Sequence, residues 1–190
     1  GSINGKKIVI KCPVLEPFSL ACFDTERALN IKLSSSSAGA GSVPWTKMIG
    51  EVNVPEQIRM PQDLARIGIV WEKEGDGDTL EQYLIQGKDL YRVLNVKEQG
   101  GRLRPELCKN VMGQLLIALD QMHDQGIMHR DVKPSNTLVV PADKEHPLKI
   151  IDFGSSCDFS DPFKRGIGDA TCDPMYCPPE KRITLLQPTK

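Results

Sequence analysis

The sequence predicts an α+β fold, because short apolar runs that suit strands are followed by segments with helical periodicity. Residues 67–71 (Ile-Gly-Ile-Val-Trp) have the composition of a buried strand, and residues 8–11 (Ile-Val-Ile-Lys) also suit a strand. Residues 105–122 begin with Pro-Glu, which suits the first turn of a helix. Apolar residues then recur at helical spacing and should face the core: Leu107, Val111, Leu115, Leu119 and Met122.

Two short aliphatic runs follow this helix, at residues 137–140 and 148–151, with a polar loop between them. We expect them to pair as two small strands, which places Asp152 where the second strand ends. Residues 34–41 (S-S-S-S-A-G-A-G) should form an exposed loop, and residues 48–64 show little periodicity and stay unassigned.

The polar residues around this strand pair form the most informative motif of the chain. Residues 129–136 read H-R-D-V-K-P-S-N, and residues 152–154 read D-F-G. Either H-R-D or D-F-G alone is a common tripeptide. Together, in this order and with Lys133 and Asn136 at these offsets, they resemble the catalytic and metal-binding loops of protein kinases.

The resemblance to protein kinases covers about residues 6–183 and implies a bilobal protein kinase-like fold, with a small β-rich N-lobe and a helical C-lobe. We expect the N-lobe part in residues 1–72 and the C-lobe part in residues 73–190 of a single kinase domain. The domain is expected to be incomplete at both ends, because no Gly-rich phosphate loop precedes Lys11 and only ten residues follow Glu180.

Protein kinases transfer the γ-phosphoryl group of ATP to a hydroxyl, so the resemblance implies a role for each residue of the motif. Asp131 should orient the hydroxyl and accept its proton, and Lys133 should place a cation beside the moving phosphoryl group. Asn136 and Asp152 should bind Mg²⁺, which prefers oxygen ligands. His129 is expected to be a buried structural residue and not a base.

Residues 8–11 also resemble the V-A-I-K strand motif of kinases, whose lysine reaches the α- and β-phosphates of ATP. Lys11 needs an acidic partner to hold it there. Glu26 is the best candidate and Asp24 the alternative. Asp24 should also cap a short helix that begins beside it.

Residues 67–85 resemble the kinase hinge, with a buried strand, a polar segment and then a helical segment that starts near Thr79. By this resemblance Trp71 is the gatekeeper residue. Backbone groups of Glu72 and Glu74 would hydrogen-bond the adenine, and Asp78 would contact the ribose. A calcium loop at this acidic segment is excluded, because the next alternate position after Asp78 is a leucine and offers no oxygen ligand.

Residues 176–180 (Y-C-P-P-E) resemble the end of a kinase activation segment. Asp173 stands where many Ser/Thr kinases have a Thr that bonds the catalytic Asp and Lys. Its carboxylate would repel Asp131 unless Lys133 or another cation pairs with it.

Two forms of regulation are hypotheses at this point. Arg130 resembles the kinase Arg that pairs with a phosphate on the activation segment, and Thr171 is our candidate for the hydroxyl that carries it. Six scattered cysteines without a C-x-x-C pair indicate a reducing compartment. Three of them, Cys157, Cys172 and Cys177, lie in or near the activation segment, where they could form a redox switch.

Two short stretches indicate the kinase subfamily. Residues 70–80 (V-W-E-K-E-G-D-G-D-T-L) and 173–180 (D-P-M-Y-C-P-P-E) resemble the thylakoid state-transition kinases of algae and plants. The resemblance implies a Ser/Thr kinase on the stromal face of the chloroplast thylakoid, acting on light-harvesting or photosystem proteins. The same resemblance explains why an Asp, and not a Thr, stands at position 173. Specificity for Tyr is not expected, because Lys133 stands where Ser/Thr kinases have their lysine.

Composition narrows the partners. A formal net charge of −1 gives no signal for nucleic-acid binding, and no apolar run approaches the ~20 residues of a membrane span, so membrane association should not occur through this segment. Two alternatives remain open: a nucleotide-binding pseudokinase or scaffold, supported by the missing Gly-rich loop, and a generic cytosolic Ser/Thr kinase. The intact set of Lys11, Asp131, Asn136 and Asp152 favours the enzyme.

Overall fold

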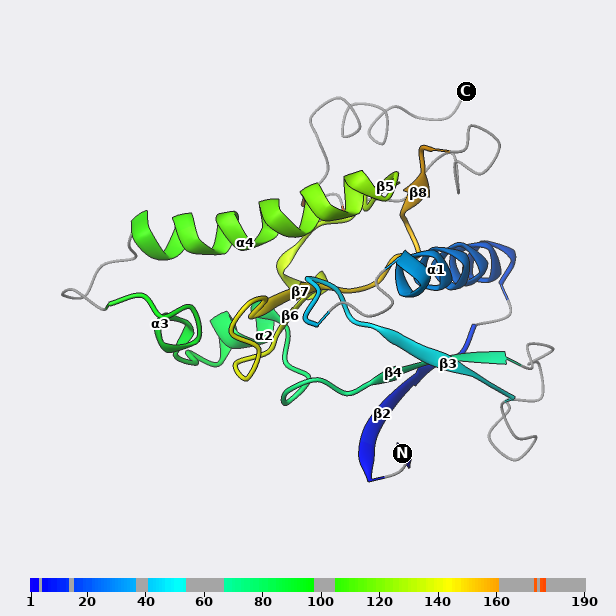
Figure 1. Ribbon diagram of the computed structural model, residues 1–190, viewed down its shortest axis with the longest axis horizontal. Coiled ribbons are helices and arrows are strands. Elements are labelled where there is room, and N and C mark those ends of the chain that lie inside the picture. Colours follow the sequence, from blue (N-terminus) through cyan, green and yellow to red (C-terminus); the bar gives the residue numbers. More distant parts are fainter. Residues whose placement is uncertain are drawn as a thin grey trace.

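The computed structural model describes residues 1–3, 5–13, 16–36, 41–53, 67–97, 105–160, 173 and 175–176. A twisted sheet lies on one side of the molecule, and the long helix α4 with two small strand pairs lies on the other (Figure 1). Helix α1 runs between these two parts.

The sheet has four strands in the order β1-β2-β4-β3. Their bounds are Ser2–Ile3 for β1, Lys6–Lys11 for β2, Met48–Asn53 for β3 and Ile67–Glu72 for β4. Neighbouring strands are antiparallel, and Ile10 of β2 lies opposite Val70 of β4. Strand β4 is covered on both faces, which explains its continuous apolar sequence.

Helix α1 (Pro17–Ser36) joins the sheet to the helical part through two faces. Phe23 packs with Ile69 and Trp71 of β4. Leu29 and Leu33 instead join a larger cluster that contains residues of α4 and the D-F-G phenylalanine: Val43, Trp45, Ala118, Met122, Ile127, Ile150 and Phe153. The position of α1 therefore depends on both parts of the molecule.

The segment after β4 leads into two short helices, α2 (Leu80–Ile85) and α3 (Leu90–Val93). The helical segment expected from about Thr79 is present as α2, and Thr79 caps it: its hydroxyl accepts from the Gln82 N–H, and the Gln82 side chain accepts from the Thr79 N–H. The apolar residues of α2 and α3 pack with Leu107, Val139 and Leu148 in a second core cluster.

Helix α4 (Pro105–Asp124) confirms the predicted helix, and its stripe of apolar residues is buried or half-buried against the two clusters. Strand β5 (Ile127–Met128) follows and pairs with β8 (Cys157–Asp158). The motif residues then pass through a short 3₁₀ turn, η2 (Pro134–Asn136), into β6 (Thr137–Val139), which pairs with β7 (Leu148–Ile150) as predicted.

Two expectations were wrong. Asp24 does not cap a helix, because α1 begins seven residues earlier at Pro17, a residue that suits a first helical turn. Residues 34–36 are not a loop after the helix but its last turn, where the Ser35 and Ser36 hydroxyls donate to the carbonyls of Ile31 and Leu33. The unassigned segment contains β3 up to Asn53, and residues 54–64 lie outside the described residues.

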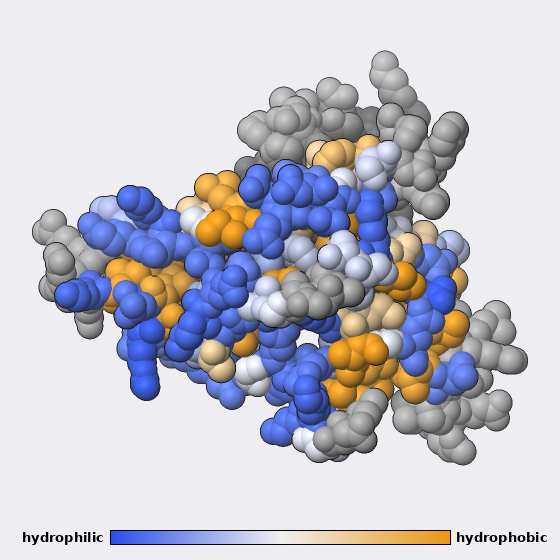
Figure 2. All heavy atoms as spheres, in the orientation of Figure 1, coloured by the Kyte–Doolittle hydropathy of each residue, from blue (hydrophilic) through white to orange (hydrophobic). Residues whose placement is uncertain are grey.

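Hydrophobic surface gathers over the strands of the sheet and over α4 on the face shown in Figure 2. Exposed apolar residues of these elements are Val9, Ile10, Ile49, Met112, Leu116 and Ile117. Within the described part of the chain, none of the helices has the length and apolar character needed to cross a membrane.

Candidate active site

A pocket of about 440 Å³ opens between the sheet and the β6–β7 pair. Apolar side chains of β2 and β4 form one wall, and polar residues of the sequence motifs form the inner end. Its lining consists of Val9, Ile10, Lys11, Glu26, Thr46, Trp71, Glu72, Lys73, Glu74, Gly77, Leu138, Ile151, Asp152 and Phe153. Residues from six separate segments therefore meet in one concave site, as is common for small-molecule sites.

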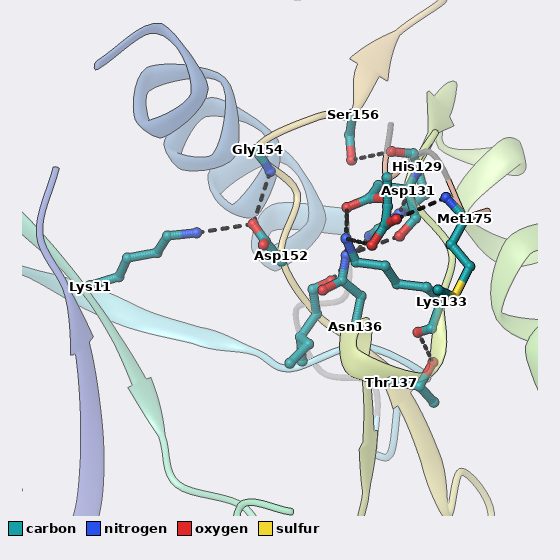
Figure 3. Close-up of polar contacts among 12 residues, drawn as sticks. Lys11, His129, Asp131, Lys133, Asn136, Thr137, Asp152, Gly154, Ser156 and Met175 are labelled. Carbon is teal, nitrogen blue, oxygen red and sulfur yellow. Dashed lines mark hydrogen bonds and ion pairs between the residues drawn. The ribbon is translucent and has the colours of Figure 1, made fainter. Parts of the chain in front are cut away.

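Lys11 reaches two carboxylates from distant parts of the chain. Its Nζ lies 2.6 Å from Oε2 of Glu26 on α1 and 2.9 Å from Oδ1 of Asp152, the contact drawn in Figure 3. Glu26 is buried, whereas the side chains of Lys11 and Asp152 are 42% and 46% exposed. The structure thus brings Glu26 to Lys11, while the alternative partner Asp24 is exposed on α1.

The three charges influence one another's protonation. Burial acts to lower the pKa of Lys11, but the carboxylates of Glu26 and Asp152 outweigh it and raise this pKa. Burial raises the pKa of Glu26 despite the opposing effect of Lys11. Burial also acts to raise the pKa of Asp152, but Lys11 outweighs it and the pKa is lowered, so Asp152 is a carboxylate at neutral pH.

Both motif loops contain a residue with a left-handed backbone. Arg130 and Asp152 each have φ of 66°, a conformation that costs side-chain-bearing residues about 1–3 kcal/mol and often occurs at functional sites. The Arg130 guanidinium donates from Nε to the Ser155 carbonyl at 2.6 Å and from a terminal nitrogen to the Ser156 carbonyl at 3.1 Å. These two bonds connect the loop of Arg130 to the segment that follows the D-F-G motif.

His129 is a buried structural histidine, as predicted. Its Nε2 donates to the Ile151 carbonyl at 3.1 Å, and its Nδ1 accepts from the Asp131 N–H at 3.3 Å. The ring also contacts Phe153 edge to face. Burial lowers the pKa of His129, so the neutral ring with one donor and one acceptor matches these two bonds.

Asp131 is held by the next residues of its own loop (Figure 3). Its Oδ2 accepts from Nδ2 of Asn136 at 2.8 Å and lies 3.0 Å from Nζ of Lys133. Nζ of Lys133 also lies 3.8 Å from a carboxylate oxygen of Asp173. Lys133 is therefore the cation that relieves the repulsion expected between Asp131 and Asp173.

The remaining oxygens of this loop suit a hydroxyl and a magnesium ion. Oδ1 of Asp131 is buried and has no hydrogen-bond partner among the described residues. Asn136 uses its amide nitrogen toward Asp131, which leaves its amide oxygen for another group. The Asn136 carbonyl accepts from the Ile151 N–H at 3.0 Å, so Asn136 lies beside the chain that carries Asp152.

This donor set fits Mg²⁺ bound together with phosphates. The described residues contain no group of three or more His, Cys, Asp or Glu side chains that could hold a metal. Mg²⁺ is usually held by only one or two carboxylates, with waters and substrate phosphates as its other ligands. Asn136 and Asp152, on neighbouring segments of the chain, supply one amide oxygen and one carboxylate, which is what such a site needs.

The predicted hinge residues begin at the end of β4, with Glu72 as its last residue. Glu72 and Glu74 line the pocket, with their carboxylates 2.8 Å from Lys6 and 2.5 Å from Lys149. Asp78 does not line the pocket, and its carboxylate is bonded to Lys88. Trp71 closes the inner wall.

Sequence reasoning missed the residues that support this site. Asn30 is buried on α1 and accepts at Oδ1 from Trp71 Nε1 at 3.2 Å, and Lys149 is a buried lysine on β7. An unexpected charge or amide inside an apolar stretch is the signal that could have revealed them. Thr171, Cys172 and residues 177–180 lie outside the described residues, and Cys157 is buried as a free thiol.

The model of the family described as "Protein kinase domain" matches residues 22–184. Two relatives from Arabidopsis thaliana are the chloroplastic serine/threonine-protein kinases STN8 and STN7. STN8 is 36% identical over 124 residues, which are 59% of this chain and 23% of STN8. STN7 is 32% identical over 127 residues, which are 63% of this chain and 22% of STN7.

A solved structure shares the fold. The crystal structure of a Stt7 homolog from Micromonas algae soaked with ATP superimposes with a TM-score of 0.70 and 22% identity, over 92% of this chain and 51% of that chain. The chain thus spans about a quarter of the two curated relatives and about half of the solved one. The predicted protein kinase fold, and the resemblance to chloroplast Ser/Thr kinases, are confirmed.

Proposed function

The chain belongs to the protein kinase family, and on that premise we propose that it transfers the γ-phosphoryl group of ATP to Ser or Thr hydroxyls of protein substrates. One observation carries this proposal. The loop holds Asp131 by one carboxylate oxygen and leaves the other without a partner among the described residues. An oriented carboxylate with a free oxygen can accept the proton of an attacking hydroxyl.

The neighbouring residues give the rest of the chemistry. Lys133 would stabilise negative charge on the moving phosphoryl group while it holds Asp131 in place. Lys11, fixed by Glu26, would bind the α- and β-phosphates. Asn136 and Asp152 would hold Mg²⁺, which when bound neutralises phosphate charge.

The pocket suits the nucleotide base. The apolar side chains of Val9 and Ile10 are about half exposed because they form its open wall, and a flat purine ring would cover them. The backbones of Glu72 and Glu74 at the outer end would hydrogen-bond the base. Asp78 would reach the ribose only by leaving Lys88.

We infer the substrates and compartment from the subfamily resemblance. Similarity to STN8 and STN7, both named as chloroplastic, supports a chloroplast Ser/Thr kinase. The hinge stretch and the D-P-M-Y-C-P-P-E stretch support the finer proposal of a stromal thylakoid kinase for light-harvesting or photosystem proteins.

Phosphoryl transfer to a protein tests the function. The protein is incubated with Mg²⁺ and ATP labelled at either the γ- or the α-phosphorus, with thylakoid membranes or casein as acceptor. Label from the γ-position should appear on Ser and Thr, label from the α-position should not, and Asp131→Asn should greatly reduce transfer. Nucleotide binding without any transfer would support the pseudokinase alternative and contradict the proposal.

A further inference from the structure

Lys149 is a lysine that the structure buries almost completely. It lies on β7 between the core residues Leu148 and Ile150, three positions before Asp152, and only 5% of it is exposed. A buried ammonium is costly unless it is paired. Its Nζ meets that need with two carboxylates, Oε2 of Glu74 at 2.5 Å and Oδ2 of Asp143 at 3.0 Å.

Asp143 extends the network beyond this pair. The Ser42 hydroxyl donates to its Oδ2 at 2.5 Å, and the N–H groups of Glu145 and His146 donate to its Oδ1 at 3.1 and 2.9 Å. Burial acts to raise the pKa of Asp143, but these hydrogen bonds and Lys149 outweigh it and lower the pKa to about 2. Asp143 is thus a permanent anion at neutral pH.

Glu74, the other partner of Lys149, lines the pocket. The Glu74 carbonyl accepts from the Gly77 N–H at 3.2 Å, which closes a tight turn. Gly75 inside this turn has φ of 55°, and a Cβ there would come within 3.3 Å of the Val139 carbonyl. Among the described residues, no backbone carbonyl accepts from the Glu74 N–H, so this donor remains for a ligand in the pocket.

Lys149 therefore connects the two ends of the pocket. Its side chain holds the turn at Glu74, and its backbone belongs to the strand that delivers Asp152 to Lys11. This ion pair and the strand β7 are one connection between the outer and inner ends of the pocket, and the pairing of β2 with β4 is another.

We propose that Lys149 is a positioning residue for the nucleotide, which sets the spacing between the base-binding backbone of Glu74 and the phosphate-binding end of the pocket at Lys11 and Asp152. This inference rests on the proposed function, because it takes the ligand to be an adenine nucleotide. Lys149 does not line the pocket, and its side chain reaches the pocket through Glu74.

Nucleotide affinity, measured separately from catalysis, tests the proposal. The dissociation constants of ADP and of Mg²⁺-ATP are measured by titration calorimetry with the full protein, its Lys149→Met and Glu74→Gln variants, and Lys149→Arg. Loss of a charge-assisted hydrogen bond that orients the turn should weaken binding about 10-fold or more in Lys149→Met and Glu74→Gln. Lys149→Arg, which keeps the charge, should recover much of the affinity.

The matched control is Glu51→Gln, which removes the surface pair between Arg27 and Glu51, whose atoms are 2.8 Å apart, away from the pocket. Its dissociation constants should equal those of the wild type. In transfer assays Lys149→Met and Glu74→Gln should raise the KM for ATP. They should leave kcat within about 3-fold, because the loop around Asp131 is unchanged.

The outcomes separate the two proposals. Wild-type affinity in folded Lys149→Met and Glu74→Gln overturns the role of Lys149. If Lys149→Met fails to fold, Glu74→Gln decides alone, because Lys149 keeps its pair with Asp143 in that variant. Lys149-dependent binding without phosphoryl transfer would support this inference and overturn the proposed function.

Discussion

Lys133 resolves a conflict of charge that the sequence contains. Two carboxylates, Asp131 and Asp173, are placed near each other, and Lys133 lies 3.0 Å from the first and 3.8 Å from the second. Burial acts to lower the pKa of Lys133, but the two acids, Asp131 foremost, outweigh it and raise this pKa. The lysine therefore stays charged and can serve both acids.

His129 shows how the loop that contains Asp131 depends on a neutral ring. Both ring nitrogens are engaged, one toward the Ile151 carbonyl and one toward the Asp131 N–H. A second proton would remove the acceptor that the Asp131 N–H needs. The fold thus positions the carboxylate of Asp131 through an imidazole that must not be charged.

We predict that stability falls as the pH drops below about 6.5, the ordinary pKa of histidine. Burial lowers the pKa of His129, so the unfolded chain takes up a proton in this range and the folded one does not. Urea denaturation at several pH values should show a loss of up to about 1.4 kcal/mol per pH unit from this residue.

The variant His129→Phe should be less stable at neutral pH but should lose this part of the pH dependence. His123→Gln is the control, because His123 is exposed at the end of α4. An unchanged pH slope in His129→Phe would contradict the explanation.

At the scale of elements, α1 transmits the position of the sheet to the site. Asn30 donates from Nδ2 to the Glu26 carbonyl at 2.8 Å and accepts at Oδ1 from Trp71 at 3.2 Å. One buried amide thus connects the helical turn that carries Glu26 to the strand that leads into the hinge. Glu26 on this turn pairs with Lys11.

Replacing Asn30 by Ala should lower the free energy of unfolding by about 1–3 kcal/mol, because the buried Trp71 N–H loses its acceptor. Urea denaturation of Asn30→Ala, Trp71→Phe and the double variant measures the coupling, which should be about 0.5–3 kcal/mol for contacting residues. Ser35→Ala on the exposed side of α1 is the control. Additive losses would show that the two side chains do not act together.

Local signals predicted some elements well. Helix α4 has a regular apolar stripe, and α2 has a Thr79–Gln82 capping box, so both could be located from sequence. The H-R-D and D-F-G loops could be located because each motif consists of a few residues that are consecutive or nearly so in the sequence.

Elements that depend on distant partners could not be predicted. Helix α1 ends in consecutive serines, which favour loops, but burial of Leu33 keeps its last turn helical. Strand β3 contains Gly50 and a bulge, and it forms because β4 supplies its hydrogen bonds. Likewise, nothing near Lys149 in sequence indicates Glu74, which lies 75 residues away.

At the scale of the whole molecule, the pocket is formed where the sheet, α1 and the β6–β7 pair meet. Lys11, Glu26 and Asp152 come from three segments, and Lys11 forms an ion pair with each of the two acids. A ligand that binds all three would therefore stabilise the complete arrangement of these parts.

We predict that ATP with Mg²⁺ raises the thermal midpoint of unfolding. A ligand that binds only the folded state adds about 2.7 kcal/mol at 100 times its dissociation constant. ATP with EDTA should stabilise less, and Asp152→Ala should remove the difference between the two conditions. Scanning fluorimetry checks this, and an equal effect of ATP with and without Mg²⁺ would contradict the magnesium site at Asn136 and Asp152.

The most direct test of the account is the single-turnover rate of γ-phosphoryl transfer at saturating Mg²⁺-ATP, in the wild type and in Asp131→Asn. We predict a rate about 10² to 10⁴ lower in the variant, the usual contribution of a general base, with an unchanged dissociation constant for the nucleotide. A variant that transfers phosphate as fast as the wild type would contradict the assignment of Asp131 and the mechanism built on it.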